Sequence, residues 1–285
     1  MLCPICNRSQ PRTLIIKKAR KLLICQGCRH IWYEQMPTAS ELSEYYSTEY
    51  TELHLQEEKQ EASAAYHRSH AEELRGLVGG SMAIADVGSS IPVFLREAKQ
   101  DCSRRIGVDL SVQAHELGKQ WGIEMMTPEG FLQTVPDESL DVLRYSHVLE
   151  HLVDPMGTLQ RQVSKLKRGA LVYITQPNFP VFRAEPASVD LHDSVWPSHL
   201  HFFNVLSVLA MLDRAGLRLV RFLTLNDERK SVAEYGPYLD FLTAADRLEP
   251  LKEITEGRVA FTGWPFYAGR DLACYARKEF ALSKR

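Results

Sequence analysis

Two histidines and a glutamate lie close together in the middle of the chain, and these side-chain types suit proton transfer or metal binding. His147, Glu150 and His151 are spaced at i, i+3 and i+4 in the run SHVLEHLVDP. A helical turn over this run would place all three side chains on one face. The three groups can hold a divalent metal ion, or one histidine can act as a general base that the glutamate orients.

A second histidine cluster follows in the run LHDSVWPSHLHFF. Its members are His192, His199 and His201, so five of the ten histidines fall in two short stretches. This uneven distribution favours one shared site. The alternative is that His151 and His201 are buried and hydrogen-bonded, with no catalytic task, because histidine serves both purposes.

Four of the six cysteines form two CxxC pairs, a spacing typical of a structural zinc site. Cys3, Cys6, Cys25 and Cys28 are spaced C-x2-C-x18-C-x2-C, and strand-like runs separate the two pairs. Two CxxC turns can place four thiolates at the corners of a tetrahedron, the geometry that zinc prefers. The spacing predicts a zinc ribbon whose closed coordination suits a structural or docking role. Two redox pairs or unliganded thiols are the alternative.

Short apolar runs alternate with helical stretches from residue 82 onward, which is typical of an α/β fold with a largely parallel sheet. The first run contains Asp86 and closes on Gly88, and the second ends on Asp109, 21 residues after that glycine. Ligands bind outside the carboxyl ends of such strands, and an acid at this distance suits the hydroxyls of a ribose. We therefore expect a ligand site around this βαβ unit.

The other elements are expected to continue the alternation. Strands are predicted at residues 82–87, 106–108, 123–127, 140–145, 169–175, 217–225 and 271–277, and helices at 54–78, 93–100, 111–121, 154–166 and 201–215. Residues 128–130 are interpreted as a turn, and residues 226–268 as a helical insertion over the site. The expected domains are a zinc ribbon at 1–35, a helical linker at 36–80 and an α/β domain at 81–285.

The bulk properties are those of a globular protein without a strong charge bias. The chain has 285 residues, 45% of them hydrophobic, and a formal net charge of −2. This balance argues against a general attraction to nucleic acid or to membranes. The polar N-terminus carries no secretory signal, and no apolar run approaches the roughly 20 residues of a membrane helix. CxxC pairs without an export signal favour a reducing compartment, so we expect a cytoplasmic protein.

The motif DVG at residues 86–88, the acid Asp109 and the run HVLEHLVDP together resemble class I S-adenosylmethionine-dependent methyltransferases. The ribbon and the following MPTASELSEYYSTEY resemble the N-terminal part of bacterial members that modify cell-surface sugars or other small metabolites. The resemblance covers nearly the whole chain, and HVLEHLVDP is its most specific motif. It implies a Rossmann-like, seven-stranded sheet with an antiparallel last strand, preceded by a small zinc ribbon.

The resemblance also implies a role for particular residues in binding S-adenosylmethionine. Asp86 and Gly88 would lie under the methionine part of the cofactor, and Asp109 would bind its ribose. Leu110, Glu129 and Gly130 would flank the adenine, and Ser146 and His147 would line the sulfonium side. Ser90 and Pro92 stand where the family usually carries further glycines, and the Ser90 hydroxyl could bind the methionine carboxylate. Loss of glycine restricts how closely the backbone approaches a ligand.

The favoured hypothesis is methyl transfer to an oxygen of a sugar or another small molecule. His151 is the candidate base, Glu150 would orient it, and His199 or His201 would hold the acceptor. The Glu-His pair is also similar to metal-dependent O-methyltransferases, which implies a possible second divalent ion near His147, Glu150, His151 and His201.

Three other readings are weighed against this hypothesis. A non-catalytic relative and an RNA-directed enzyme that docks through the ribbon are the alternatives. A nicotinamide oxidoreductase is disfavoured because only one glycine of the G-x-G-x-x-G set is present. The oligomeric state stays open.

Overall fold

The computed structural model describes residues 1–8, 10–17, 20–47, 63–179, 197–225, 231–234 and 271–279. The chain divides into two compact units. The first unit comprises Met1–Thr38, Leu149–Thr158 and Ile174–Ala276. The second unit comprises Ala39–Val148, Leu159–Tyr173 and Arg277–Arg285.

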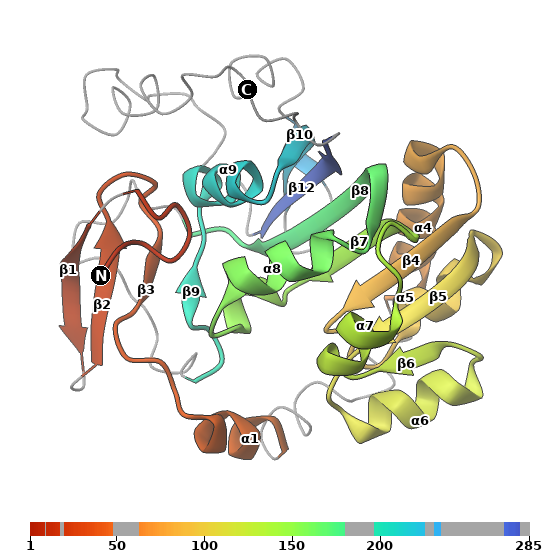
Figure 1. Ribbon diagram of the computed structural model, residues 1–285, viewed down its shortest axis with the longest axis horizontal. Helices are drawn as coiled ribbons and strands as arrows, with labels where there is room; N and C mark the ends of the chain where they lie inside the picture. Colours follow the sequence, from red (N-terminus) through yellow and green to blue (C-terminus); the bar gives the residue numbers. More distant parts are fainter. Residues whose placement is uncertain are drawn as a thin grey trace. The chain divides into compact units, whose positions relative to one another are not determined.

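The larger sheet has the strand order β11-β10-β12-β8-β7-β4-β5-β6 (Figure 1). β4 pairs in parallel with β5 and β7, β5 pairs in parallel with β6, and β11 is an antiparallel edge strand. All seven predicted strands are present, and β11 is an addition to them. The bounds are β4 (Met82–Val87), β5 (Cys102–Val108), β6 (Glu124–Met126), β7 (Leu140–Ser146), β8 (Leu166–Pro177), β10 (Leu217–Leu225), β11 (Ser231–Glu234) and β12 (Asp271–Lys278).

The strands at the centre of this sheet are buried over nearly their whole length. All six residues of β4 are buried, and β7 is buried at five of its seven positions. A strand covered on both faces carries a continuous apolar run instead of an alternating one. The run MAIADV therefore identifies a central strand, and its one acid, Asp86, is the exception that needs a partner.

The helices of the second unit include some that begin or end at recognisable signals. They are α1 (Ala39–Ser47), α4 (Ala64–Val78), α5 (Val93–Glu97), α6 (Val112–Gln120) and α7 (Pro128–Thr134). α4 ends at Gly79, whose left-handed backbone (φ 86°) lets its N–H donate to Arg75, as the glycine pair predicted. The expected start of this helix at residue 54 lies outside the described residues.

The turn predicted at residues 128–130 is wrong, because these residues form the first turn of α7. The Thr127 side chain accepts a hydrogen bond from the Gly130 N–H, and Pro128 occupies the first helical position. An N-cap threonine followed by proline favours helix initiation over a turn.

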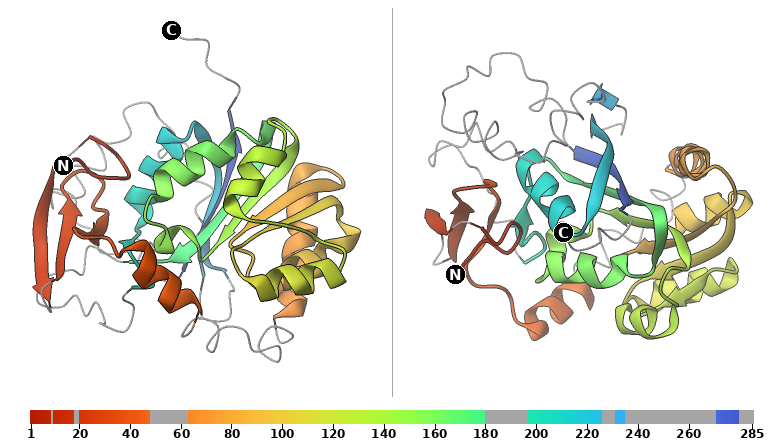
Figure 2. Two further views of the ribbon diagram at one scale, coloured as in Figure 1. Left: turned by 60° about the horizontal axis from the view of Figure 1, so that its bottom comes forward. Right: turned by 45° about the horizontal axis from the view of Figure 1, so that its top comes forward.

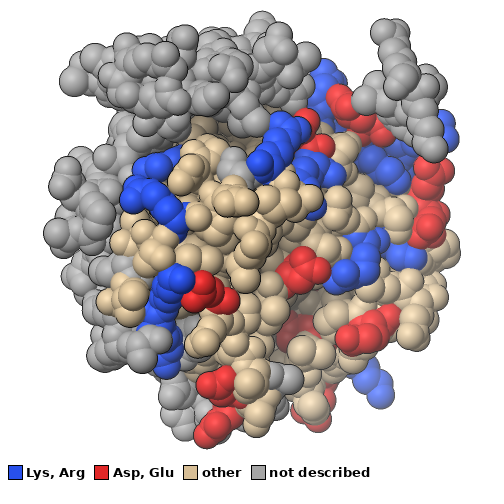
Figure 3. All heavy atoms as spheres, turned by 60° about the vertical axis from the view of Figure 1, so that its left-hand side comes forward, with Lys and Arg blue, Asp and Glu red and all other residues tan. Residues whose placement is uncertain are grey.

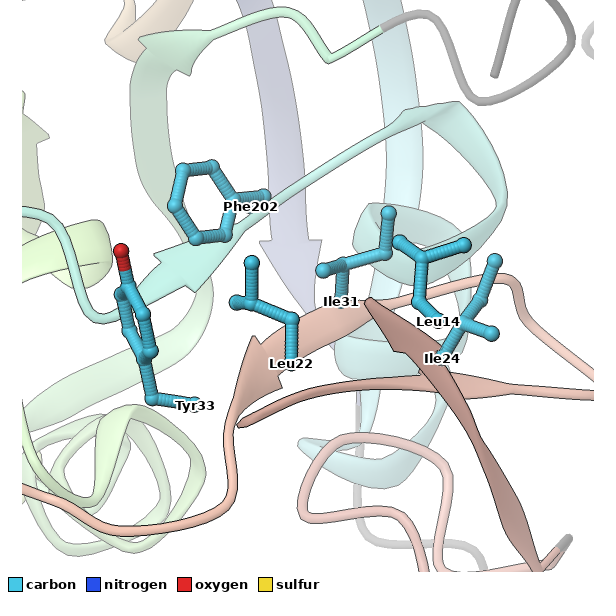
Figure 4. Close-up of a cluster of buried hydrophobic side chains, with 6 residues drawn as sticks. All are labelled: Leu14, Leu22, Ile24, Ile31, Tyr33 and Phe202. Atoms are coloured by element: carbon cyan, nitrogen blue, oxygen red, sulfur yellow. The ribbon is translucent and has the colours of Figure 1, made fainter. Parts of the chain in front are cut away.

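The first unit contains a second, four-stranded sheet in the order β1-β2-β3-β9. β1 (Pro11–Lys17), β2 (Arg20–Cys25) and β3 (Ile31–Tyr33) are consecutive antiparallel strands, and β9 (His201–Phe202) pairs antiparallel with β3 (Figure 1). Because the ribbon is small, it recruits Phe202 into its core with Leu14, Leu22, Ile24, Ile31 and Tyr33 (Figure 4).

The helix predicted to start at His201 begins later in the chain. α9 (Val205–Arg214) is capped by Asn204, which exchanges hydrogen bonds with Ser207 in a capping box. This cap excludes His201 and leaves it in β9. α9 lies beside β10 in both views of Figure 2.

Three further elements complete the described chain, and one of them, the 3₁₀ helix η1 (Ala98–Gln100), follows α5 directly. The 3₁₀ helix η2 (Leu149–His151) precedes α8 (Pro155–Val163), which confirms the helix expected after Asp154. β11 shows that residues 231–234 are a strand, so the helical interpretation is wrong there. The rest of the interpreted insertion lies outside the described residues. No helix in the described ranges is long and apolar enough to cross a membrane.

Candidate functional site

The four cysteines of the CxxC pairs converge in the first unit, with all four Sγ atoms within 4.8 Å of one another. Cys3 lies 3.7 Å from Cys28 and Cys6 lies 3.6 Å from Cys25, measured between Sγ atoms, and all four thiols are free. Four buried thiols at these distances fit a tetrahedral, closed zinc site, because zinc prefers four thiolates at about 2.3 Å.

The two knuckles share a left-handed residue directly after the second cysteine. The residue after each second cysteine, Asn7 or Arg29, has a positive φ, at 53° and 58°. The Asn7 N–H donates to the Cys3 carbonyl, and the Cys25 N–H donates to the His30 carbonyl. The two turns bring all four Sγ atoms together.

The residues predicted to bind the cofactor belong to the second unit. They follow the carboxyl ends of four neighbouring parallel strands, which meet at one edge of the sheet. They lie after β4 (Gly88, Ser90), after β5 (Asp109, Leu110), in the first turn of α7 after β6 (Glu129, Gly130) and at the end of β7 (Ser146, His147).

The turn after β4 requires glycine at one position. Gly88 has φ 65°, and a Cβ there would lie 2.5 Å from the Val148 Cγ2 atom. Its N–H donates to the Val108 carbonyl, which joins the ends of β4 and β5. The backbone at Gly88 is therefore both left-handed and too crowded for a side chain.

Ser90 takes a backbone conformation that normally favours glycine, with φ 47°. Its N–H donates to Asp109 Oδ2 at 2.8 Å, and Asp109 Oδ1 accepts the Ser111 N–H at 2.8 Å. The Asp109 carboxylate thus connects the glycine turn to the start of α6. His147 is also strained, at φ 55° directly after β7. Strain of this kind is common at ligand sites.

An apolar side chain stands directly beside this carboxylate. Leu110 is 75% exposed, one of the most exposed large hydrophobic residues of the described chain. An exposed leucine at a strand's carboxyl end suits contact with a flat ring such as adenine.

The acid of β4 is neutralised by a residue that sequence reasoning missed. Arg144 lies opposite Asp86 in the parallel register and donates to Asp86 Oδ1 at 2.7 Å, and both are almost fully buried. The guanidinium carbon lies 4.2 Å from the centre of the Phe94 ring. Burial acts against the charged guanidinium, but the Asp86 carboxylate raises the pKa of Arg144. For Asp86, burial raises the pKa of the carboxyl group, and the positive charge of Arg144 acts in the opposite direction. The signal in the sequence is a single arginine inside the apolar strand LDVLRYS.

The structure brings three potential ligand or acid–base groups together in the first unit. Glu150, His151 and His199 place their ligand atoms within 4.8 Å of one another, and we call them the histidine cluster. His151 Nδ1 lies 2.8 Å from the Ser198 carbonyl oxygen. A carbonyl only accepts, so Nδ1 carries the proton and Nε2 carries the lone pair.

The lone pair of His151 faces the buried glutamate. Its Nε2 lies 3.8 Å from Glu150 Oε1, and Glu150 is 1% exposed. The His199 ring stands edge-on to the His151 ring, with centroids 4.8 Å apart. A buried carboxylate beside an imidazole nitrogen can serve as a pair of metal ligands, or the carboxylate can orient the imidazole as a general base.

His201 has different surroundings from the cluster. It is 1% exposed, and its Nδ1 lies 3.0 Å from His30 Nε2, with the two rings stacked. Burial lowers the pKa of His201 to about 4 and holds that of His30 well below its usual value, so both rings are neutral near pH 7. His147 is not in the close set either, and His192 lies outside the described residues.

Comparison with known proteins supplies a family and a fold. A family model described as a methyltransferase domain matches residues 56–222. No curated protein matches the sequence.

Solved structures resemble this chain at low sequence identity. A SAM-dependent methyltransferase from Archaeoglobus fulgidus is 20% identical over 78% of this chain and 97% of its own, with a TM-score of 0.51. The Burkholderia thailandensis 1,6-didemethyltoxoflavin-N1-methyltransferase, solved with 1,6-didemethyltoxoflavin and S-adenosylhomocysteine, is 12% identical over 95% of this chain and 100% of its own, with a TM-score of 0.55. At these identities the structures show the fold alone.

Proposed function

Because this chain belongs to the methyltransferase domain family and has the fold of class I S-adenosylmethionine-dependent methyltransferases, we propose that it methylates a hydroxyl oxygen of a small molecule, such as a sugar. The family model matches residues 56–222. The observation that carries the oxygen assignment is the His151 ring, whose lone pair on Nε2 lies beside the buried Glu150 carboxylate. A hydroxyl needs a base before it can accept a methyl group, and this pair can supply one.

The cofactor side of the proposal rests on the second unit. When bound, S-adenosylmethionine supplies a methyl group that its sulfonium already activates. Gly88 allows close approach of the backbone, and Asp109, fixed by two N–H donors, is suited to the ribose hydroxyls. Leu110 would cover one face of the adenine, with Glu129 and Gly130 beside it, and the strand-end residues Ser146 and His147 would line the sulfonium side.

The acceptor side of the proposal assigns one role to each cluster member. The Ser198 carbonyl fixes the tautomer of His151, so that Nε2 can take a proton from the acceptor hydroxyl. Glu150 would stabilise the imidazolium that forms, and His199 would hold the acceptor. His201, packed against His30, would position the segment instead of touching substrate.

The test follows the label of [methyl-³H]S-adenosylmethionine into fractions of a metabolite extract. The proposal expects label in small, nuclease- and protease-resistant products. Replacement of His151 by Ala should reduce transfer by about 10²-fold or more, as for loss of a general base, while S-adenosylhomocysteine still binds. Unchanged transfer by His151→Ala would remove the oxygen assignment.

An RNA-directed or non-catalytic relative is the alternative. On the face drawn in Figure 3, basic and acidic residues are interspersed over the described surface, without a continuous basic stripe. Nucleic-acid binding draws on such stripes, so this face gives no support to the RNA-directed alternative. Label recovered in nuclease-sensitive material would favour the alternative.

A divalent metal in the histidine cluster is the second candidate. It is favoured by the convergence of Glu150, His151 and His199, which replaces the set first expected with His147 and His201. Two imidazoles and one carboxylate suit zinc, iron or cobalt and leave positions open for an acceptor oxygen. Metal analysis distinguishes the two cases. Two bound ions per chain in the parent protein, falling to one in His199→Ala, would support a metal ion in the histidine cluster. One ion per chain in both proteins would exclude it.

We also assign the enzyme to the cytoplasm in this proposal. All six cysteines are free thiols in the structure, which suits a reducing compartment.

A further inference from the structure

The segment that carries His199 is bonded to the zinc ribbon on one side and to Glu150 on the other. In β3, Ile31 pairs with Phe202 and Trp32 pairs with His201. The Tyr33 N–H donates to the Leu200 carbonyl at 3.4 Å, and the Leu200 N–H donates to the Glu150 carbonyl at 2.8 Å. One residue, Leu200, therefore joins the backbone of the ribbon to the backbone of the histidine cluster.

This segment has little regular structure of its own. β9 is two residues long, and a strand of that length is stable only when it is paired with a neighbour. Its neighbour is β3, and no other strand pairs with it within the described ranges. The carbonyl that fixes the His151 tautomer belongs to Ser198, three residues before β9. The segment that contacts His151 and carries His199 is therefore linked through the backbone to β3.

The metal knuckles in turn hold β3 and the helix that follows β9. The second knuckle is continuous with β3 through His30, whose carbonyl accepts the Cys25 N–H. At the start of α9, Asn204 Nδ2 donates to the Arg29 carbonyl of this knuckle at 2.9 Å. At the end of α9, Arg214 donates to the Pro4 and Ile5 carbonyls of the first knuckle. Both ends of α9 are thus fixed to the cysteine turns.

Side-chain packing supports the same connection. Phe202 of β9 completes the apolar core of the ribbon, as Figure 4 shows. His201 stacks on His30, which also stacks on Trp32 of β3. These contacts pack both side chains of β9 against ribbon residues, so a loosened ribbon would weaken the hold on β9.

We propose that the ribbon is a positioning element of the histidine cluster: metal binding at Cys3, Cys6, Cys25 and Cys28 holds β9 and thereby the geometry of His151 and His199. The ribbon is then a part of the acceptor side and not a separate docking module. Cofactor binding is expected to be independent of the metal, because the residues assigned to it belong to the second unit. This inference deepens the proposed function, but it concerns geometry and does not require methyl transfer.

The experiment measures hydrogen exchange of the Leu200 amide and the ¹⁵N tautomer signals of His151 in the full, zinc-loaded chain. Cys28→Ser removes one thiolate, and Arg214→Met leaves all four thiolates but removes the donors to Pro4 and Ile5. We expect Leu200 exchange at least about tenfold faster in both variants, as for local opening, and loss of the single Nδ1–H tautomer in Cys28→Ser. Arg8→Met is the matched control, because it removes only the exposed ion pair between Arg8 and Asp213.

Each outcome decides the proposal. Unchanged Leu200 exchange in Arg214→Met would overturn it, whether or not Cys28→Ser folds. A single Nδ1–H tautomer of His151 retained in a folded Cys28→Ser would overturn it as well. S-adenosylhomocysteine binding should stay within about threefold of the parent in both variants. Loss of that binding together with the His151 signal would also overturn it, since zinc would then hold the whole chain. If the cluster geometry depends on the ribbon but no small molecule is methylated, the proposed function fails and this inference stands.

Discussion

At the residue scale, several residues assigned to the cofactor side are buried or have an unfavourable backbone conformation. Gly88 is crowded by Val148, and Ser90 and His147 have positive φ without being glycines. Asp86 and Arg144 are charges removed from water. Residues of this kind cost stability, and they persist where function requires them.

Replacing Gly88 by Ala should weaken S-adenosylhomocysteine binding and destabilise the protein. The new Cβ would approach Val148 Cγ2 to 2.5 Å, in a left-handed conformation that already costs about 1 kcal/mol. Gly122→Ala is the matched control, because Gly122 has the same φ of 65° with only the Arg105 side chain nearby, at 3.9 Å. Calorimetry should show weaker binding for Gly88→Ala alone, and equal binding in both variants would contradict this.

Replacing Arg144 by Met should destabilise the protein by about 3–5 kcal/mol near pH 7, because it leaves the buried Asp86 carboxylate without its partner. Burial already raises the pKa of Asp86 above its ordinary value, and loss of Arg144 raises it further. A raised carboxyl pKa gives stability that is present at low pH and lost as pH rises through the folded pKa.

The deficit of Arg144→Met should therefore shrink between pH 7 and pH 5. Urea unfolding at both values measures it. A deficit that stays constant or grows toward pH 5 would mean that Asp86 is not the group left unpaired.

At the element scale, boundaries follow local chemistry more closely than apolar periodicity. Seven strands of the larger sheet and most helices could be predicted from runs bounded by Gly, Ser and Asp. α7 was missed because it is only 7 residues long, and its signal is a threonine cap followed by proline. β9 could not be found, since a two-residue strand has no periodicity and its partner β3 lies about 170 residues earlier in the chain.

Replacing Asn204 by Ala should lower the free energy of unfolding by more than the loss of an ordinary helix cap does. The reason is that Asn204 both caps α9 and donates to the Arg29 carbonyl. We expect about 2 kcal/mol from the loss of a cap and a hydrogen bond. Ser111→Ala, which removes the side chain that caps α6, should cost about 1 kcal/mol. Denaturant titration compares the two, and equal costs would argue against the bond to the ribbon.

At the scale of the whole molecule, the fold class and the four-cysteine cluster were predictable because each depends on short, local patterns. The candidate sites were predictable only in part. Strand-end positions such as Asp109 follow from the βαβ order. The pairing of Arg144 with Asp86, and the choice of His199 over His201 as the partner of His151, become visible only when distant strands and loops come together. His201 is the opposite case. It is close to His199 in the sequence, but it packs against His30 of the ribbon instead of joining the histidine cluster.

The central claim, that the strand-end residues of the second unit bind S-adenosylmethionine, is tested most directly by calorimetric titration with S-adenosylhomocysteine. The account predicts one saturable site per chain. Asp109→Ala, which removes the expected ribose ligand, should weaken it by about tenfold or more, as for loss of a charged hydrogen bond, and His151→Ala should leave it unchanged. No saturable heat with the zinc-loaded chain, or full affinity in Asp109→Ala, would contradict the account.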